Sequence, residues 1–194
     1  EWQMDLLSVT SSQFLQVDKT LYIVGGYGVN SFKGTFSTKP FLTAIDIPCL
    51  IKWVTHRCHE SIEGAFRHLQ HPIFQVTGGV MTQITGGPIL LLVGQNFKGA
   101  YTPASSGVYT KQIRRFKLID DGQKLKVKTY RSNPFGKDPI LRRRDLNIVP
   151  VVRKIDGRLC TQLDILAGVF TATDGVWTVP VRVDHCGNYL MEPP

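Results

Sequence analysis

Apolar runs that end in glycine occur three times along the chain, at residues 21–26, 90–95 and 164–169. The first reads Leu-Tyr-Ile-Val-Gly-Gly, the second Leu-Leu-Leu-Val-Gly-Gln and the third Asp-Ile-Leu-Ala-Gly-Val. A buried strand ends in glycine where the backbone needs a residue without a Cβ atom. Because a second β-rich run follows each of them after a loop, the pattern predicts that one supersecondary unit has been copied along the chain.

The second repeat shows the whole predicted unit. Apolar and alternating residues favour strands at residues 80–84, 89–93, 108–118 and 125–130. The first repeat has matching segments at residues 12–17, 20–24 and 41–47, and the third at residues 148–152, 163–167, 176–183 and from Tyr189 onward. We therefore expect three four-stranded units, at about residues 8–54, 74–131 and 145–194.

One segment departs from this pattern. Between residues 50 and 71 the apolar side chains recur at helix-like spacing, which predicts a helical insertion; they are Leu50, Ile51, Trp53, Val54, Ile62, Ala65, Phe66 and Leu69. An alternative interpretation makes residues 50–54 the outer fourth strand of the first unit, with a shorter helix after it. The spacing does not decide between the two.

The composition fits an all-β protein. Of the 194 residues 42% are hydrophobic, and 18 glycines and 11 prolines punctuate short segments rich in Val, Ile, Thr and aromatic residues. No apolar stretch is long enough to predict a membrane span. The 4 cysteines are not arranged in close pairs, which favours free thiols over disulfides. Because the chain begins at Glu1 without a methionine, we expect it to have been trimmed or excised from a longer chain.

The chain carries a formal net charge of +8, concentrated between Lys111 and Lys128 and at Arg142, Arg143 and Arg144. Lysines on alternating strand positions are typical of a solvated face that protects sheet edges from aggregation. The same charge could attract nucleic acid or acidic glycans. Aromatic residues are not interleaved there as a stacking platform, so nucleic acid is the less expected partner.

With these repeats the chain resembles the kelch-type, galactose-oxidase-type β-propellers. The residues that carry the resemblance are the double glycine at 25–26 followed by Tyr27, and the segments 76–79, 94–101, 113–116 and 143–150. They are most similar to a poorly characterised bacterial group with divergent kelch repeats. The resemblance implies a partial propeller of about three four-stranded blades and, in many members, export from the cell. It implies no established reaction, and no residue set here matches the copper site of galactose oxidase.

A propeller closes into a ring so that its sheets are not left open. Three blades do not close such a ring, so we expect the chain to be completed by further blades. Those blades would come from the rest of a longer chain or from a second copy.

Two groups of polar residues are candidates for ligand or partner binding. Arg143, Arg144, Asp145 and Asn147 stand at the entry of the third unit, where guanidinium groups can hold a carboxylate or phosphate. The alternative is that Asp145 pairs with Arg143 or Arg144 and ties neighbouring units together. The second group follows the glycine-closed strands and comprises Gln95, Asn96, Lys98, Tyr101 and, in the first unit, Tyr27. These residues can equally serve as turn and capping residues.

Five potential metal ligands are crowded into sixteen residues: His56, Cys58, His59, His68 and His71. His68 and His71 would share one face of the predicted helix. No second compact ligand pair stands at the spacing of a structural zinc site, so neither a metal nor another cofactor is predicted.

No Ser/His/Asp arrangement, phosphate-binding glycine loop or carboxylate pair can be assembled from the sequence, so no catalytic residue is predicted. The leading hypothesis is a non-catalytic scaffold that presents its loops to a protein or a glycan. One alternative is a sugar-modifying enzyme similar to an acidic-sugar epimerase, with Arg143, Arg144 and Asp145 around the substrate carboxylate. The less favoured alternative is a basic surface that binds nucleic acid.

Overall fold

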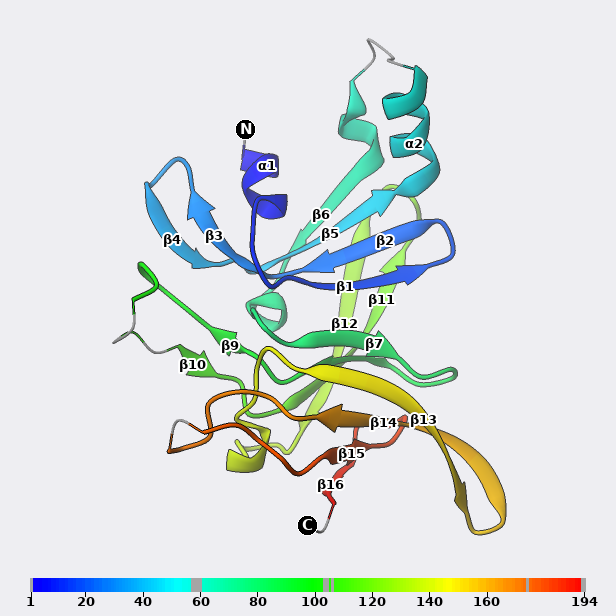
Figure 1. Ribbon diagram of the computed structural model, residues 1–194. Coiled ribbons are helices and arrows are strands. Elements are labelled where there is room, and N and C mark those ends of the chain that lie inside the picture. Colours follow the sequence, from blue (N-terminus) through cyan, green and yellow to red (C-terminus); the bar gives the residue numbers. More distant parts are fainter. Residues whose placement is uncertain (1, 57–60, 103–104, 106, 174, 193–194) are drawn as a thin grey trace.

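Antiparallel sheet dominates the part of the chain that the structure describes, which comprises residues 2–56, 61–102, 105, 107–173 and 175–192 of a computed structural model. These residues form five sheets of two to four strands, and none of the five closes into a barrel (Figure 1). The prediction of an all-β fold is confirmed.

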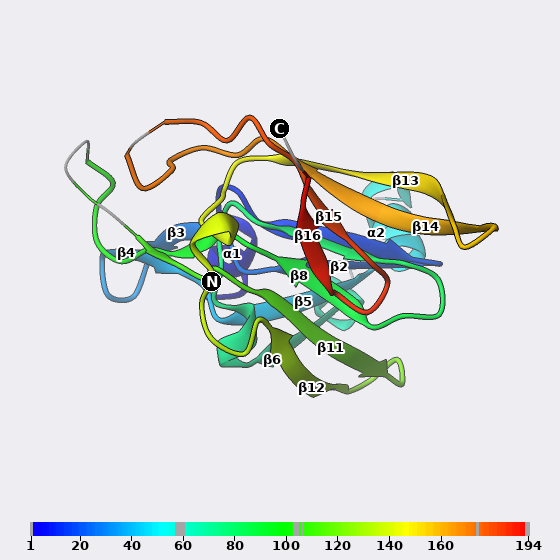
Figure 2. The ribbon, with the colours of Figure 1, turned by 90° about the horizontal axis from the view of Figure 1, so that it is seen from below.

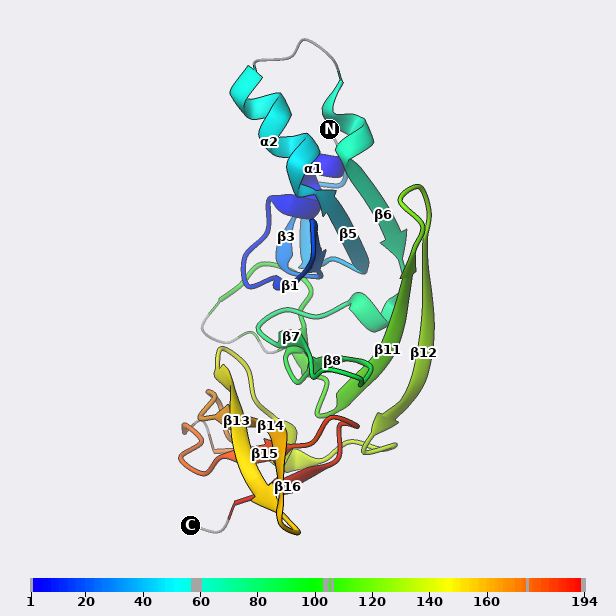
Figure 3. The ribbon, with the colours of Figure 1, turned by 90° about the vertical axis from the view of Figure 1, so that its right-hand side faces the viewer.

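Three sheets have four strands each and share one topology, in which each strand pairs with the one before it within the sheet. Sheet I contains β1 (Gln13–Val17), β2 (Thr20–Val24), β5 (Phe41–Asp46) and β6 (Phe66–Gln70). Sheet II contains β7 (Val80–Gln83), β8 (Ile89–Leu92), β11 (Ile113–Asp120) and β12 (Leu125–Asn133). Sheet III contains β13 (Asn147–Ile155), β14 (Arg158–Leu166), β15 (Val181–Val183) and β16 (Tyr189–Met191). Figure 3 shows the three sheets following one another along the molecule.

Each four-stranded sheet carries an insertion between its second and third strands. In sheet I this is the hairpin of β3 (Tyr27–Asn30) and β4 (Thr35–Thr38), and in sheet II it is the pair β9 (Gln95–Asn96) and β10 (Val108–Tyr109). In sheet III a single bridge joins Val169 and Val176. Figures 1 and 2 show all three insertions projecting on one side of the molecule.

The hydrophobic core lies in two layers between the three sheets. All four residues of β8 are buried because the strand contributes to both layers. Ile89 and Leu91 pack toward sheet I, with Tyr22 and Leu42, whereas Leu90 and Leu92 belong to the layer shared with sheet III. A continuous apolar run is typical of a strand buried on both faces, and it is the feature that the sequence shows most clearly.

Backbone hydrogen bonds repeat between neighbouring sheets. The Gly26 N–H donates to the Val76 carbonyl, and the Gly94 N–H donates to the Arg143 carbonyl, both at 2.9 Å. Both glycines have φ of +83°. The glycines that close the first two apolar runs therefore connect their own sheets to the segment that leads into the next one.

The helical prediction for residues 50–71 is correct only in its first part. Helix α2 spans Ile47–His56, but Ile62–Ala65 forms a single 3-10 turn and Phe66–Gln70 is the strand β6. Neither interpretation of the sequence assigned the fourth strand of sheet I to this position. The periodicity was misleading because residues 66–70 pair with the free edge of β5, and the local sequence does not show that edge. Strand β6 is antiparallel to β5, with Leu42 opposite Leu69.

The remaining helices are short. They are α1 (Trp2–Leu7) and the 3-10 turns Pro72–Phe74 and Pro139–Leu141. Among the described residues no helix has the length and apolarity that crossing a membrane requires. Cys49, Cys160 and Cys186 are free thiols, and Cys58 lies outside the described residues.

A half-buried charged cluster fastens sheet I to sheet II. The Arg67 guanidinium donates to both carboxylate oxygens of Asp120, at 3.1 and 2.6 Å, and the Tyr22 hydroxyl donates to the same carboxylate at 2.9 Å. Burial of the Tyr22 ring and its contact with the Asp120 carboxylate raise the pKa of Tyr22 to about 12. The Arg67–Asp120 ion pair thus holds β6 and β11 together, although the two strands are far apart in the sequence.

The close approach of the sheets at Gly94 makes a specific prediction. A Cβ atom on Gly94 would lie 2.8 Å from the Thr77 carbonyl oxygen and 2.9 Å from the Gly79 nitrogen, whereas a Cβ atom on Gly122 would meet nothing within 4 Å. Both residues have a left-handed backbone, with φ of +83° and +86°. We expect Gly122→Ala to cost about 1 kcal/mol of unfolding free energy, which is the backbone penalty alone, and Gly94→Ala to cost at least about 2 kcal/mol more. Urea unfolding of the two variants measures the difference, and equal losses would contradict the role assigned to Gly94.

Candidate functional site

A short lead-in segment precedes each four-stranded sheet, and the three lead-in segments meet at one place. Ser11, Gly78 and Asp145 each lie two residues before the first strand of their sheet, and all three have a left-handed backbone, with φ of 52°, 67° and 51°. The Gly78 N–H donates to the Ser11 carbonyl, and the Asp145 N–H donates to the Gly78 carbonyl, both at 2.9 Å. Through Gly78, this series of backbone bonds links Ser11 and Asp145, which are more than 130 positions apart in the sequence.

The lead-in segments and the insertions enclose a cavity of about 360 Å³, which we call the mouth pocket. Its lining residues are Thr10, Ser11, Tyr27, Thr77, Gly78, Gln95, Phe97, Tyr101, Arg144 and Asp145. The volume lies in the range of small-molecule sites.

Aromatic side chains form one wall of the mouth pocket. The rings of Tyr27 and Phe97 are 5.4 Å apart and nearly perpendicular, and the rings of Phe97 and Tyr101 are also 5.4 Å apart. The Tyr27 hydroxyl donates to the Gly99 carbonyl at 2.6 Å, which fixes its ring. Phe97 is buried, whereas Tyr101 is 57% exposed, so the wall offers an aromatic surface that a ligand can reach.

The guanidinium of Arg144 lies beside that wall. Its Nη2 donates to the Tyr101 hydroxyl at 3.0 Å, and its plane lies 4.5 Å from the centre of the Phe170 ring. Asp145 follows it closely, with 3.6 Å between the Arg144 Nε and the Asp145 Oδ2. Burial disfavours the charge of Arg144, but its contacts with Tyr101, Tyr109 and Asp145 outweigh burial and raise its pKa. The pocket therefore holds one fixed cation and one carboxylate.

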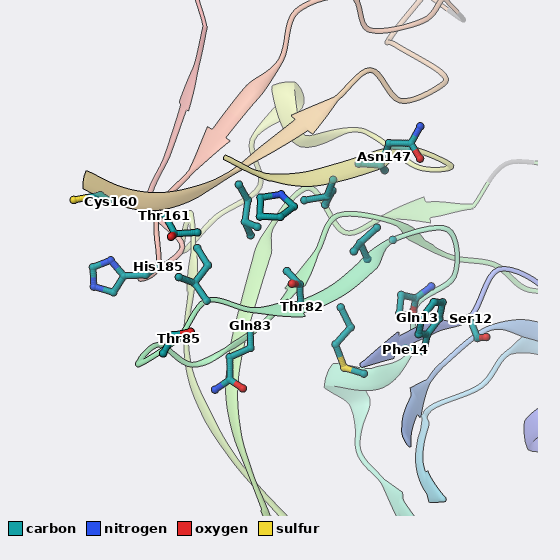
Figure 4. A pocket seen from close by; sticks show the side chains of 18 residues that line it. Ser12, Gln13, Phe14, Thr82, Gln83, Thr85, Asn147, Cys160, Thr161 and His185 are labelled. Carbon is teal, nitrogen blue, oxygen red and sulfur yellow. The ribbon is translucent and has the colours of Figure 1, made fainter. Parts of the chain in front are cut away.

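A second, larger groove lies along the first strands of the three sheets. This axial groove has a volume of about 780 Å³ and is lined by residues of β1, β7 and β13. Its lining begins at the residues that directly follow the mouth pocket in each lead-in segment, namely Ser12, Gly79 and Leu146. Figure 4 shows the side chains of the groove, with Gln13, Thr82, Gln83 and Asn147 among those labelled.

The structure brings most of the predicted site residues together. Tyr27, Gln95, Tyr101, Arg144 and Asp145 line the mouth pocket, although they come from three separate parts of the sequence. Asn147 stands at the start of β13 and lines the axial groove instead.

Three predicted residues lie elsewhere. Asn96 is half-buried in β9, and Lys98 is exposed beyond it, with its backbone bridged to Ser37. Neither lines the mouth pocket. The third is Arg143.

Arg143 is fully buried, and its guanidinium is bound by other parts of the protein. Its Nε, Nη1 and Nη2 donate to the carbonyls of Ile140, Ala167 and Val179 at 2.8 to 2.9 Å, and its guanidinium lies 4.4 Å from the centre of the Trp177 ring. Burial lowers the pKa of Arg143 to about 10, so it is charged at neutral pH.

The adjacent Arg142 also lies over an aromatic ring, that of Tyr109, and donates to the carbonyls of Phe170 and Thr171. The three consecutive arginines therefore have different roles. Arg142 and Arg143 tie the insertion of sheet III to its surroundings, and Arg144 alone lines the mouth pocket.

The suggested histidine cluster does not assemble on one helix. His68 lies in β6 with its Nδ1 3.0 Å from the Thr43 hydroxyl, whereas the Nδ1 of His71 accepts the Ile73 N–H and begins a 3-10 turn. The side chain of His56, together with Cys58 and His59, lies outside what the structure describes. Within the described residues no group of three or more potential ligands is placed to hold a metal ion.

Sequence reasoning missed half of the mouth pocket. Thr10, Ser11, Thr77, Gly78 and Phe97 were not among the predicted site residues. A signal was nevertheless present, because the three lead-in segments occupy the same place before each repeat. Aligning the units at the starts of β1, β7 and β13 places Thr10 and Thr77 opposite Arg144, three residues before each strand.

Comparison with known proteins adds no family to this description. No model of a protein family matches the chain, and no curated protein matches it. The resemblance to kelch-type propellers therefore stays a prediction, and the function has to be argued from the site itself.

Replacement by lysine is expected to lower the stability of the fold much more at Arg143 than at Arg144. Arg143→Lys should cost about 3 kcal/mol of unfolding free energy, because a single ammonium group cannot donate to three separate carbonyls. Arg144→Lys should cost less than about 1 kcal/mol, because one hydrogen bond at the rim of a pocket is lost. Urea unfolding compares the two, and a larger loss for Arg144→Lys would contradict the division of roles.

Proposed function

We propose that this chain is a non-catalytic binding module and that the mouth pocket holds a sugar residue of a glycan. Sheets I, II and III are, in this proposal, three blades of a kelch-like propeller. The observation that carries the proposal is the convergence of three lead-in segments on one cavity that combines an aromatic wall, a guanidinium and a carboxylate.

The chemistry of that cavity suits a sugar. A sugar ring has an apolar C–H face and a rim of hydroxyl groups, so it needs a flat apolar surface together with polar partners at its edge. The exposed ring of Tyr101 supplies the surface. The Asp145 carboxylate can accept from hydroxyl groups, and the Arg144 guanidinium can donate to a carboxylate or a hydroxyl group. An acidic sugar uses all three.

The axial groove supports an elongated ligand over a single sugar. Because the groove residues directly follow the mouth-pocket residues in all three lead-in segments, a chain bound by one terminal residue can continue over Asn147 and Gln83. Amide side chains both donate and accept, which matches a series of hydroxyl groups. We therefore expect affinity to rise with the number of sugar residues.

Titration calorimetry with an oligosaccharide selected from a screen of acidic and neutral glycans tests the proposal. Arg144→Gln and Tyr101→Ala should each weaken binding of the selected glycan about tenfold or more, because a charge-assisted hydrogen bond and an aromatic contact are lost. Lys98→Gln is the matched control: it removes a positive charge from the same insertion but outside the pocket lining, and it should leave the dissociation constant within about twofold.

Two results would overturn this function. One is a glycan that binds with unchanged affinity to both the Arg144 and the Tyr101 variants. The other is turnover of an acidic sugar by the wild-type chain, which would favour the epimerase-like alternative with Arg144 and Asp145 at the substrate. Arg143 would have no direct part in that reaction, because its guanidinium is committed to three carbonyls.

We also propose that a further sheet of the same kind packs against sheet III. The repeated bonds between sheets support this. The Gly168 N–H and the Asp145 carbonyl occupy the positions at which the Gly94 N–H and the Gly78 carbonyl are bonded to the following sheet. In the described part of the chain neither group has a hydrogen-bond partner.

The outward face of sheet III favours another part of a longer chain over a second copy as the source of that sheet. Leu163 and Ile165 pack toward sheet II, so Gln162 and Asp164 point away, and Asp164 accepts from Arg153 at 2.9 Å. The corresponding outward residues of sheet I are apolar, with Leu21 and Ile23 alternating with the core residue Tyr22. A charged face and an apolar face are poorly matched.

Amide hydrogen exchange and mass in solution test this completion together. We expect the isolated 194-residue chain to have the 21.7 kDa mass of one copy and to exchange the Gly168 amide much faster than the Gly94 amide. A dimer with a protected Gly168 amide would assign the further sheet to a second copy. A monomer with equal protection at the two glycines would contradict the completion altogether.

A further inference from the structure

The hairpin of β11 and β12 presents a second feature that the mouth pocket does not explain. The strands pair in the register Arg115 to Tyr130, Lys117 to Lys128 and Ile119 to Lys126. Residues directly opposite each other in a sheet lie on the same face, so these six side chains share one face of the hairpin. We call it the basic face. Figure 3 shows the hairpin along one side of the molecule, with its turn beside β6.

The two faces of this hairpin differ sharply. Phe116, Leu118, Leu125 and Val127 point the other way and pack into the core between sheets I and II. On the basic face Lys117, Lys126 and Lys128 are exposed. The hairpin is therefore fixed by its apolar face while it displays a rigid row of cations.

This arrangement has an unfavourable electrostatic feature. Lys117 and Lys128 are direct cross-strand partners, and like charges directly opposite each other destabilise a sheet. The acids nearest in the sequence do not pair with Lys117 or Lys128. Asp120 is bound by Arg67 and Tyr22 on the opposite face, and Asp121 accepts the N–H groups of Gln123 and Lys124 in the turn. Among the described residues no carboxylate forms an ion pair with these three lysines.

A groove of about 680 Å³ runs beside the basic face. Arg115, Lys117 and Tyr130 line it together with the turn residues Gly86, Gly87 and Pro88. Arg115 is held in place because it donates to the carbonyls of Arg131 and Cys186. In the described part of the chain the side chains of Lys117, Lys126 and Lys128 form no hydrogen bond, and they are exposed to a ligand.

We propose that the basic face binds a linear acidic polysaccharide, as a site separate from the mouth pocket. Lysines two residues apart along a strand are about 7 Å apart, and those on paired strands about 5 Å. This regular spacing suits the sulfate or carboxylate groups of a linear polymer, which would relieve the repulsion between Lys117 and Lys128.

The aromatic content of the face favours a polysaccharide over nucleic acid. Binding of single-stranded nucleic acid relies on several aromatic rings on which successive bases stack. The basic face has one ring, that of Tyr130, and the ammonium group of Lys128 lies over it at 5.9 Å. A single occupied ring provides no stacking platform, so charge and hydroxyl contacts are the interactions that this face offers.

Heparin is the probe for this proposal, with uncharged dextran and single-stranded DNA as the other ligands. In the triple variant Lys117→Gln, Lys126→Gln, Lys128→Gln the dissociation constant for heparin at low salt should rise tenfold or more. The slope of log affinity against log salt should become shallower by about 2 to 3, since that many counterion-releasing contacts are lost. The matched control, Lys19→Gln, Lys33→Gln, Lys154→Gln, removes the same charge from exposed positions elsewhere, and we expect it to change the affinity by less than threefold.

A charge reversal separates binding from folding. Lys128→Glu should weaken heparin binding while raising the melting temperature, because it places a carboxylate opposite Lys117. Equal losses in the triple variant and its control would overturn the proposal, since net charge alone would then explain binding. Tighter binding of DNA than of heparin would also contradict it, as would dextran binding that the triple variant loses. The triple variant should lose heparin affinity by the same factor when it also carries Arg144→Gln, which separates the basic face from the mouth pocket.

Discussion

The whole arrangement depends on one repeated contact: a glycine at the end of a buried strand donates its N–H to the segment that leads into the next sheet. At Gly94 the backbones come so close that the Thr77 carbonyl oxygen and the Gly79 nitrogen would lie within 3 Å of any Cβ atom. This contact sets the distance between consecutive sheets, and the apolar layers on both faces of β8 fit that distance. A side chain here would separate the sheets and loosen both layers.

The same contact creates the candidate site. Because each sheet is fastened to the next at its lead-in segment, Ser11, Gly78 and Asp145 are drawn into one series of backbone bonds. The insertions after the closing glycines then lie on the same side and bring Tyr27, Phe97 and Tyr101 together. Arg143 stiffens this region from within, and Arg144 faces the cavity. The mouth pocket is thus a consequence of how the sheets are joined.

Local pattern was enough to predict the repeat and several strands, because residues such as Leu90 to Leu92 are apolar without interruption and are followed by glycine. Phe66–Gln70 escaped prediction because its pairing with β5 depends on a strand edge that the local periodicity does not reveal. Among the site residues, Arg144 and Asp145 stood out as a dense polar motif. Thr10 and Ser11 did not, because they lie in the pocket only through backbone bonds to Tyr27 and Gly78. The burial of Arg143 could not be separated from the exposure of its neighbour, since both have the same residue type and sequence surroundings.

The claim that the lead-in segments and insertions build a glycan site is tested most directly by mapping where a bound oligosaccharide perturbs the backbone amide signals in nuclear magnetic resonance spectra. The account predicts that the changes centre on Gly78, Tyr101, Arg144 and Asp145 and extend along β7 and β13 as the oligosaccharide lengthens. Saturable changes confined to other parts of the surface, with these four amides unmoved, would contradict it.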